Sequence, residues 1–355
     1  MTRPAISLAV LLLLSACAMV PAEAPKPVYT PVSFASLPGW PTDNVEEARP
    51  ALAASCKRLL TLPDDRSLGA DGRMGLVGHW RSFCASLPRQ SNLRAYLETS
   101  LQPWSLTSSD HSDGLFTGYY ESGLRGSLTR HGAYQTPLYK LPPGLVPGGP
   151  GVDRASIVNG SLAGRGLELV WLDDKADAFF VQVQGSGRVQ LDTGRTLRIG
   201  FAGKNGYGYT SIGRQLVERG EMKLEDVSLQ SIRAWMEMHP DKADDLMNLN
   251  QSYVFFRAMP DDPAAGPEGA AHVGLTPERS LAVDNSQIGY HVPVWLSTDT
   301  PQMQRLVVAQ DTGGAIKGIV RGDFFWGHGA NAEHQAGLMR STGRYFVLLP
   351  KTITP

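Results

Sequence analysis

The stretch DTGGAIKGIVRGDFFWG, residues 311–327, carries two aspartates, Asp311 and Asp323, among five glycines. Glycine in such numbers is typical of backbone that turns sharply or comes close to another group. The aspartates either hold these turns through their side chains or carry out chemistry. Aromatic residues follow Asp323 and would raise the pKa of its carboxyl by excluding water, whereas Arg321 would lower it. The stretch predicts tight turns and leaves the role of the two carboxylates open.

Short apolar or alternating runs separated by Gly, Pro and Asp dominate the chain after residue 110 and predict β-strands. They are GLFTGYYESGLRG (114–126), HGAYQTPLYKL (131–141), LELVWL (167–172), AFFVQVQGSGRVQL (178–191), TLRIGFAG (196–203), YVFFRAM (253–259), RSLAVD (279–284), VPVWLS (292–297), RLVVAQD (305–311) and RYFVLLP (344–350). Several such runs in close succession favour a small barrel or sandwich. Helical spacing of apolar residues predicts helices within 44–101, over 224–239 and over 332–340. The fold class is therefore mainly β with helices, and a length of 355 residues favours two domains.

The N-terminal residues 1–17 are predicted to be a lipoprotein signal peptide. An apolar stretch too short to span a bilayer ends in Leu-Ser-Ala-Cys, which resembles a bacterial lipobox. Cys17 would then become the lipidated N-terminus, and Ala18 after it favours sorting to the outer membrane; a plain signal peptide cleaved elsewhere is the alternative. Residues 18–35 are rich in Pro and Ala and are predicted to be a tether.

Composition and motifs exclude several classes of function. A net charge of -1 argues against a protein that binds nucleic acid. The Gly-Ser-Gly at 185–187 lacks the third glycine of a dinucleotide site, so no cofactor is expected. His328 and His334 do not have the spacing of metal ligands, and no metal is expected either. In an exported protein Cys56 and Cys84 either pair in a disulfide or remain buried thiols.

Two further patterns suggest binding of a neutral polar ligand such as a sugar, and a third concerns a pair of adjacent tyrosines. Gln182 and Gln184, two apart in an expected strand, would share one outward face, unless that face is merely solvated. Residues 203–214 form a Gly-rich segment with two tyrosines that could pack on a pyranose ring, or an ordinary hairpin before a helix. Tyr119 and Tyr120 are adjacent in a strand, so they should face opposite ways, one in the core and one exposed.

Five motifs in order together resemble the membrane-bound lytic murein transglycosylase A family. They are FTGYYE (116–121), QVQGSG (182–187), AGKNGYGYTSIGR (202–214), QSYVFF (251–256) and AQDTGGAIKG…RGDFFWG (309–327). The resemblance implies a double-psi β-barrel domain and a smaller inserted β-domain, with a substrate groove between them. The barrel domain would comprise residues 36–121 and 216–350, and the insertion residues 122–215. The C-terminal part resembles a 3D domain, in which Asp284, Asp311 and Asp323 match the three aspartates.

The resemblance also implies an activity and a set of site residues. The chain would be a lytic transglycosylase acting on peptidoglycan glycan strands, with Asp323 as acid and then base and Asp311 in support. The implied substrate-binding residues are Thr117, Tyr119, Tyr120, Gln182, Gln184, Ser186, Tyr209 and Lys317. It would be lipid-anchored at the periplasmic face of the outer membrane of a Gram-negative bacterium, with a complex of cell-wall enzymes as a further implied partner. The alternatives are a peptidoglycan hydrolase, a non-catalytic peptidoglycan-binding lipoprotein and an expansin-like protein.

Overall fold

A computed structural model describes residues 24–69, 72–145, 151–262 and 265–355. The expected signal peptide, Cys17 and residues 18–23 of the expected tether lie outside the described residues. The strands are β1 (Pro27–Pro31), β2 (Leu101–Ser108), β3 (Gly114–Ser127), β4 (Thr136–Tyr139), β5 (Glu168–Leu172), β6 (Ser186–Leu191), β7 (Thr196–Lys204), β8 (Val254–Ala258), β9 (Ser280–Val283), β10 (Pro293–Asp299), β11 (Gln302–Asp311), β12 (Arg321–His328) and β13 (Arg340–Pro350). The helices are α1 (Arg49–Leu59), α2 (Val77–Ser86), α3 (Leu93–Ser100), α4 (Arg154–Ser156), α5 (Lys175–Gln184), α6 (Ile212–Glu218), α7 (Leu229–Met238), α8 (Pro240–Asn248) and α9 (Ala330–Leu338). The protein is therefore mixed and mostly β, as the sequence predicts.

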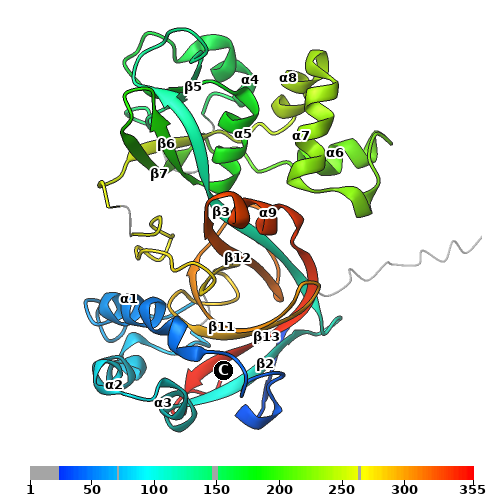
Figure 1. The fold of residues 1–355 in the computed structure, drawn as a ribbon. Helices are drawn as coiled ribbons and strands as arrows, with labels where there is room; N and C mark the ends of the chain where they lie inside the picture. Colours follow the sequence, from blue (N-terminus) through cyan, green and yellow to red (C-terminus); the bar gives the residue numbers. More distant parts are fainter. Residues whose placement is uncertain (1–23, 70–71, 146–150, 263–264) are drawn as a thin grey trace, which may run out of the picture.

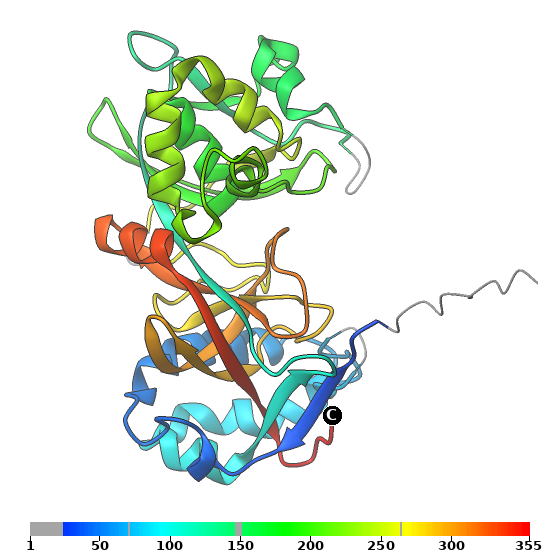
Figure 2. The same cartoon turned by 90° about the vertical axis from the view of Figure 1, so that its right-hand side faces the viewer.

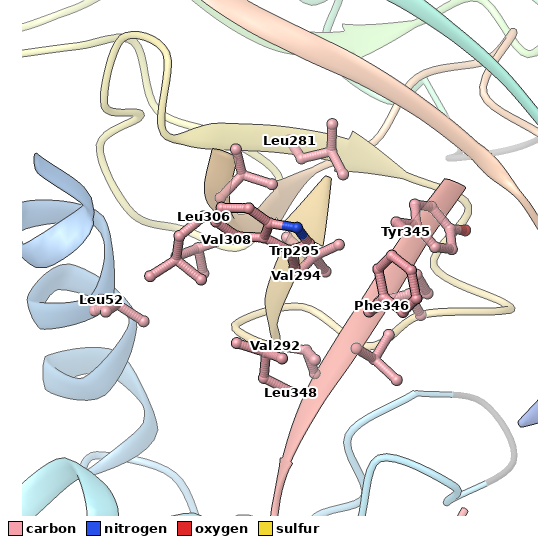
Figure 3. Close-up of a cluster of buried hydrophobic side chains, with 14 of the residues drawn as sticks. Leu52, Leu281, Val292, Val294, Trp295, Leu306, Val308, Tyr345, Phe346 and Leu348 are labelled. Atoms are coloured by element: carbon pink, nitrogen blue, oxygen red, sulfur yellow. The ribbon is translucent and has the colours of Figure 1, made fainter. Parts of the chain in front are cut away.

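The lower part of Figure 1, here called the first region, comprises the described residues of 24–121 and 265–355. In it β13 pairs with β10, β10 with β11, β11 with β9, β9 with β12, β12 with β3, and β3 again with β13. The hydrogen-bonded pairs thus return to the strand from which they start. Apolar side chains of these strands, several of them in consecutive buried runs, form the main core, in which Trp295, Leu306 and Leu348 lie in one cluster with Leu52 of α1 (Figure 3).

The helices α1, α2 and α3 cover this core, as the helical spacing within 44–101 predicts. Cys56 of α1 and Cys84 of α2 form a disulfide, so the paired alternative is the correct one. Among the described residues, no helix is both long enough and apolar enough to span a membrane.

The upper part of Figure 1, here called the second region, comprises the described residues of 122–258. Strand β3 belongs to both regions, because it pairs with β12 through Glu121 and with β6 from Ser122 onward. Figure 2 shows β3 continuing from one region into the other past α9. The second region continues beyond residue 215, since β8 pairs with β7 and α7 packs against α5 in one apolar cluster. A boundary at 215 would fall inside α6.

The expected strand over 178–191 is wrong in its first half, which forms α5. Asp174 caps this helix by accepting a hydrogen bond from the Asp177 backbone N–H, and Gly185 ends it in a left-handed conformation. Five consecutive residues from Ala178 to Gln182 are buried, which a helix packed on two sides allows. The apparent alternation of Val and Gln therefore came from a helix, and only Ser186 onward is a strand.

The expected tether is also partly wrong, because residues 27–31 form strand β1 at the edge of the sheet. Val28 and Tyr29 favour a strand, and β1 pairs antiparallel with β2. Proline cannot donate a backbone hydrogen bond, but an edge strand tolerates it at positions that face away from the neighbour. The chain is thus fixed to the first region from Pro27 onward.

Candidate active site

Asp323 lies on β12 with its side chain on the face opposite the core. The next residue, Phe324, is fully buried in the core, so the alternation of a strand directs the carboxyl of Asp323 outward, where it is partly exposed. The Thr117 hydroxyl on β3 donates a hydrogen bond to Asp323 Oδ1, and the Arg321 guanidinium donates to Thr117 Oγ1 at 2.9 Å. One threonine therefore connects the candidate acid to a cation.

The surroundings of Asp323 favour its protonated form. Burial raises the pKa of this carboxyl from its ordinary value of 3.8 to about 6, and the charge of Asp311 acts in the same direction. The positive charge of Arg321 and the hydrogen bond from Thr117 lower the pKa but do not cancel the effect of burial. Asp323 can therefore donate a proton just below neutral pH, as a general acid must.

Asp311, at the end of β11, has both carboxyl oxygens occupied by hydrogen bonds. Oδ2 accepts from the Tyr119 hydroxyl at 3.0 Å, and Oδ1 accepts from the backbone N–H groups of Ala270 and Thr312, each at 2.9 Å. Burial raises the pKa of Asp311, while these hydrogen bonds lower it. The geometry suits a group that holds Tyr119 in place beside Phe325, whose ring centroid lies 5.1 Å away.

The third aspartate, Asp284, holds a turn. Its carboxylate accepts hydrogen bonds from the Gly318 backbone N–H at 2.9 Å and from the Ser286 hydroxyl at 2.8 Å. Burial acts to raise the pKa of Asp284, but these hydrogen bonds outweigh it and the pKa is lowered. The exposed Lys317 amine lies 3.7 Å from the same carboxylate, and the role of Asp284 is thus to fix this loop.

The two tyrosines of FTGYYE face opposite ways, as predicted, but the expectation that one is exposed is wrong. Both are buried, because β3 is covered on both faces where it passes between the regions. Tyr119 contacts Asp311, whereas the Tyr120 hydroxyl donates to Glu333 of α9 at 3.1 Å. The Tyr120 backbone N–H donates to Gln184 at 3.0 Å, which joins β3 to the end of α5.

The outward glutamine face expected from the sequence does not exist, because Gln182 is buried in α5. Its amide oxygen accepts a hydrogen bond at 2.8 Å from the guanidinium of Arg154, which is buried as well. Arg154 also donates to the backbone carbonyls of Asn250 and Ser252. Ser186, at the start of β6, is buried. Gln182 therefore supports the interior of the second region and does not face a ligand.

Tyr209 brings the Gly-rich segment of the second region to the DTGG turn of the first. A β-carbon added at Gly314 would lie 3.5 Å from the Tyr209 Cβ, so the two backbones approach closely. Burial raises the pKa of Tyr209, and the charge of Asp323 adds to this effect. Of the predicted site residues, the structure therefore gathers Thr117, Tyr119, Tyr209 and Asp311 near Asp323.

Sequence reasoning missed two asparagines that position the Gly-rich segment. The Asn205 amide donates to the backbone carbonyls of Val152 and Gln251, and its oxygen accepts from the Tyr253 backbone N–H at 2.9 Å. The Asn250 side chain accepts from the Thr210 N–H at 3.1 Å. Asn205 lies inside the Gly-rich run, and this position was the signal that could have predicted its backbone contacts; Asn250 has no such signal around it.

The described residues contain no group of three or more His, Cys, Asp or Glu side chains that could hold a metal ion. His328 and His334 are both exposed. The site consists of carboxyl, hydroxyl and guanidinium groups.

Comparison with known proteins gives consistent matches over most of the chain. A family model of the MltA specific insert domain matches residues 115–257, and a model of the 3D domain matches residues 279–349. The chain is 35% identical over 268 residues to the membrane-bound lytic murein transglycosylase A of Escherichia coli (strain K12). The matched segment covers 72% of this chain and 71% of that protein.

Solved structures agree with the sequence matches. The fold is similar to that of a membrane-bound lytic murein transglycosylase from Agrobacterium tumefaciens, with a TM-score of 0.83 and 34% identity over 91% of this chain and 98% of that one. It is also similar to Escherichia coli MltA with bound chitohexaose, with a TM-score of 0.68 and 29% identity over 91% of each chain. The chain therefore belongs to the membrane-bound lytic murein transglycosylase A family.

Proposed function

We propose that this protein is a lytic transglycosylase that cleaves the β-1,4 bond between MurNAc and GlcNAc in peptidoglycan. Family membership supports the substrate class, as does the chitohexaose, a β-1,4-linked GlcNAc oligomer, bound to the E. coli relative. The observation that carries the proposal is the partly exposed carboxyl of Asp323, whose pKa of about 6 suits a proton donor.

In the first step Asp323, protonated, donates its proton to the oxygen that bridges the two sugars. The bond between this oxygen and C1 of the muramoyl residue breaks, GlcNAc leaves with a new hydroxyl, and positive charge develops at C1. The Arg321 guanidinium, hydrogen-bonded to Thr117, stabilises the carboxylate that forms on Asp323.

In the second step the carboxylate of Asp323 accepts the proton of the C6 hydroxyl of the same muramoyl residue. The C6 oxygen forms a bond to C1 and closes a 1,6-anhydro ring, and Asp323 is again protonated. Since the nucleophile belongs to the substrate, the step gains from proximity and needs no second catalytic carboxylate. The carboxyl oxygens of Asp311 accept hydrogen bonds from three donors, one of them the Tyr119 hydroxyl. Asp311 is therefore assigned as a residue that positions Tyr119.

We further propose that the closed cycle of strands around β12 is the double-psi barrel and that the glycan lies in a groove between the two regions. Tyr209 and Gln184 would contact it from the second region, and Thr117 and Lys317 from the first. The inserted domain would extend from Ser122 to Ala258. The mature protein would be lipidated at Cys17 and face the periplasm from the outer membrane, as the lipobox indicates.

Digestion of purified sacculi followed by mass spectrometry of the products tests this function. Wild type should release anhydro-muropeptides, and Asp323→Asn should release none while remaining folded. The matched variant Asp311→Asn should retain some activity, because its role is indirect. A product heavier by one water would indicate a hydrolase instead, and binding of sacculi without any product would indicate a non-catalytic lipoprotein.

A further inference from the structure

A pocket of about 810 Å³ opens on the first region beside the candidate acid. Leu115, Lys317, Arg321, Arg340 and Thr342 are among the residues that line it. Arg321 also donates a hydrogen bond to Thr117, so one guanidinium belongs both to the pocket and to the surroundings of Asp323. The pocket is therefore a neighbour of the reacting atoms in the proposed mechanism.

Strand register places the pocket on the same face as the acid. Thr117 on β3 pairs with Asp323 of β12 on one side and with Arg340 of β13 on the other. Residues directly paired across strands point to the same face, so these three side chains form a row. With strands about 4.8 Å apart, Arg340 starts about 10 Å from Asp323 across the sheet. This is comparable with the reach of a substituent carried on the same sugar ring.

The lysine and arginines that line the pocket, Lys317, Arg321 and Arg340, outnumber its one carboxylate, Asp113. Arg340 is exposed, and its guanidinium makes no hydrogen bond or ion pair within the described residues. Lys317 is also exposed, and its nearest carboxylate, Asp284, is occupied by hydrogen bonds from Ser286 and a backbone N–H. The acid that lines the pocket, Asp113, lies 3.3 Å from Arg344 and is thus neutralised. A pocket of this kind attracts an anion.

We propose that this pocket binds a carboxylate carried by the lactyl arm of the muramoyl residue whose C1 reacts. The carboxylate is either the free lactyl group or a carboxylate of the peptide stem attached to it, since the sugar rings themselves are neutral. Arg340 is the specificity-determining residue, and Lys317 and Arg321 complete the cationic lining. This inference rests on the proposed function, because it assumes a muramoyl residue beside Asp323.

The test compares three soluble substrates of equal chain length. They are glycan strands that carry uncrosslinked peptide stems, strands stripped of peptide by an amidase, and stripped strands whose lactyl carboxyls have been converted to methylamides. The first has carboxylates on the stem, the second on the lactyl arm, and the third has neither. Steady-state kcat and KM are measured for wild type, for Arg340→Gln and for Arg195→Gln, which removes an exposed arginine from the turn between β6 and β7.

Arg340→Gln should raise KM about tenfold on at least one of the charged substrates, the size expected for one charge-assisted hydrogen bond. The kcat on all three substrates should change by less than about twofold, and so should the KM on the methylamide strands. This is the size of effect that an ordinary surface substitution has. An increase of KM on the stem-bearing strands assigns a carboxylate of the stem as the ligand, and an increase of KM on the stripped strands assigns the lactyl carboxylate. Arg195→Gln should match wild type throughout.

If Arg340→Gln raised KM equally on all three substrates, or raised it on none of them, the inference would be overturned. The outcome is separable from that of the proposed function, which depends on whether wild type forms the 1,6-anhydro product at all. If wild type produced reducing ends instead, the proposed formation of the anhydro ring would be wrong, but the effect of substrate charge on KM would still be measurable.

Discussion

Replacing Thr117 by valine should move the pH dependence of activity in a defined direction. Valine has nearly the same shape as threonine but removes the hydroxyl that donates to Asp323 and accepts from Arg321. The hydrogen bond from Thr117 lowers the pKa of Asp323, which stands at about 6 because burial raises it. Without the hydroxyl, the carboxylate loses a donor and the pKa must rise.

The size of the shift follows from the strength of a hydrogen bond to a charged acceptor. Such a bond contributes about 1.5–3 kcal/mol, and about 1.4 kcal/mol corresponds to one pH unit. Because the proposed first step requires protonated Asp323, kcat/KM falls as pH rises through the pKa of this group in the free enzyme. The alkaline limb should therefore move from about pH 6 in wild type to about pH 7 in Thr117→Val, at the weaker end of that range.

The assay is release of anhydro product from soluble glycan strands between pH 4 and pH 9. Thr117→Ser keeps the hydroxyl and should retain the alkaline limb of wild type, which separates loss of the hydrogen bond from a change of shape. An alkaline limb that stayed in place in Thr117→Val, or moved to lower pH, would refute the assignment of Asp323 as an acid whose pKa Thr117 lowers.

Three further predictions concern stability. The disulfide between Cys56 and Cys84 closes a loop of 28 residues, so replacing both by serine should lower the free energy of unfolding by about 3–4 kcal/mol in a urea titration. The pKa of Asp323 is raised on folding, so ionisation of its carboxyl opposes folding increasingly from about pH 4 to pH 6. Asp323→Asn should therefore be more stable than wild type by about 1–3 kcal/mol at pH 8 but not at pH 4. Equal stabilities of the two proteins at both pH values would contradict this. Arg279 and Asp43 form a buried two-pronged ion pair at 2.9 Å, so Arg279→Met should cost about 3–5 kcal/mol, and adding Asp43→Asn should restore part of it in thermal unfolding.

Alternation along the strands could be predicted from the sequence, and it accounts for much of the site. In GLFTGYYE the residues Phe116 and Thr117 face opposite ways, so one enters the core and the other meets Asp323. What alternation does not show is which strands become neighbours. Thr117 and Asp323 are 206 positions apart, and their contact depends on β3 and β12 pairing in parallel. Local pattern carries no information on such a pairing.

The misread segment AFFVQVQ shows a second limit of local pattern. Val181 and Val183 alternate with glutamines as they would in a strand, but Asp174 and Gly185 bracket the run at the positions of helix caps. Giving these capping signals more weight than the alternation would have predicted α5. The burial of Gln182 could not be predicted in this way, since it depends on Arg154, which lies in a different element and needs an acceptor inside the core.

Arg321 connects the proposed chemistry to the proposed carboxylate subsite. Its positive charge opposes the effect of burial and keeps the pKa of Asp323 from rising further. A substrate carboxylate in the adjoining pocket would neutralise part of that charge, so the pKa of Asp323 would rise when the ligand binds. The acid would then be more fully protonated in the complex than in the free enzyme. The alkaline limb of kcat should consequently lie at higher pH than that of kcat/KM on charged strands, and the two should coincide on the neutral methylamide strands.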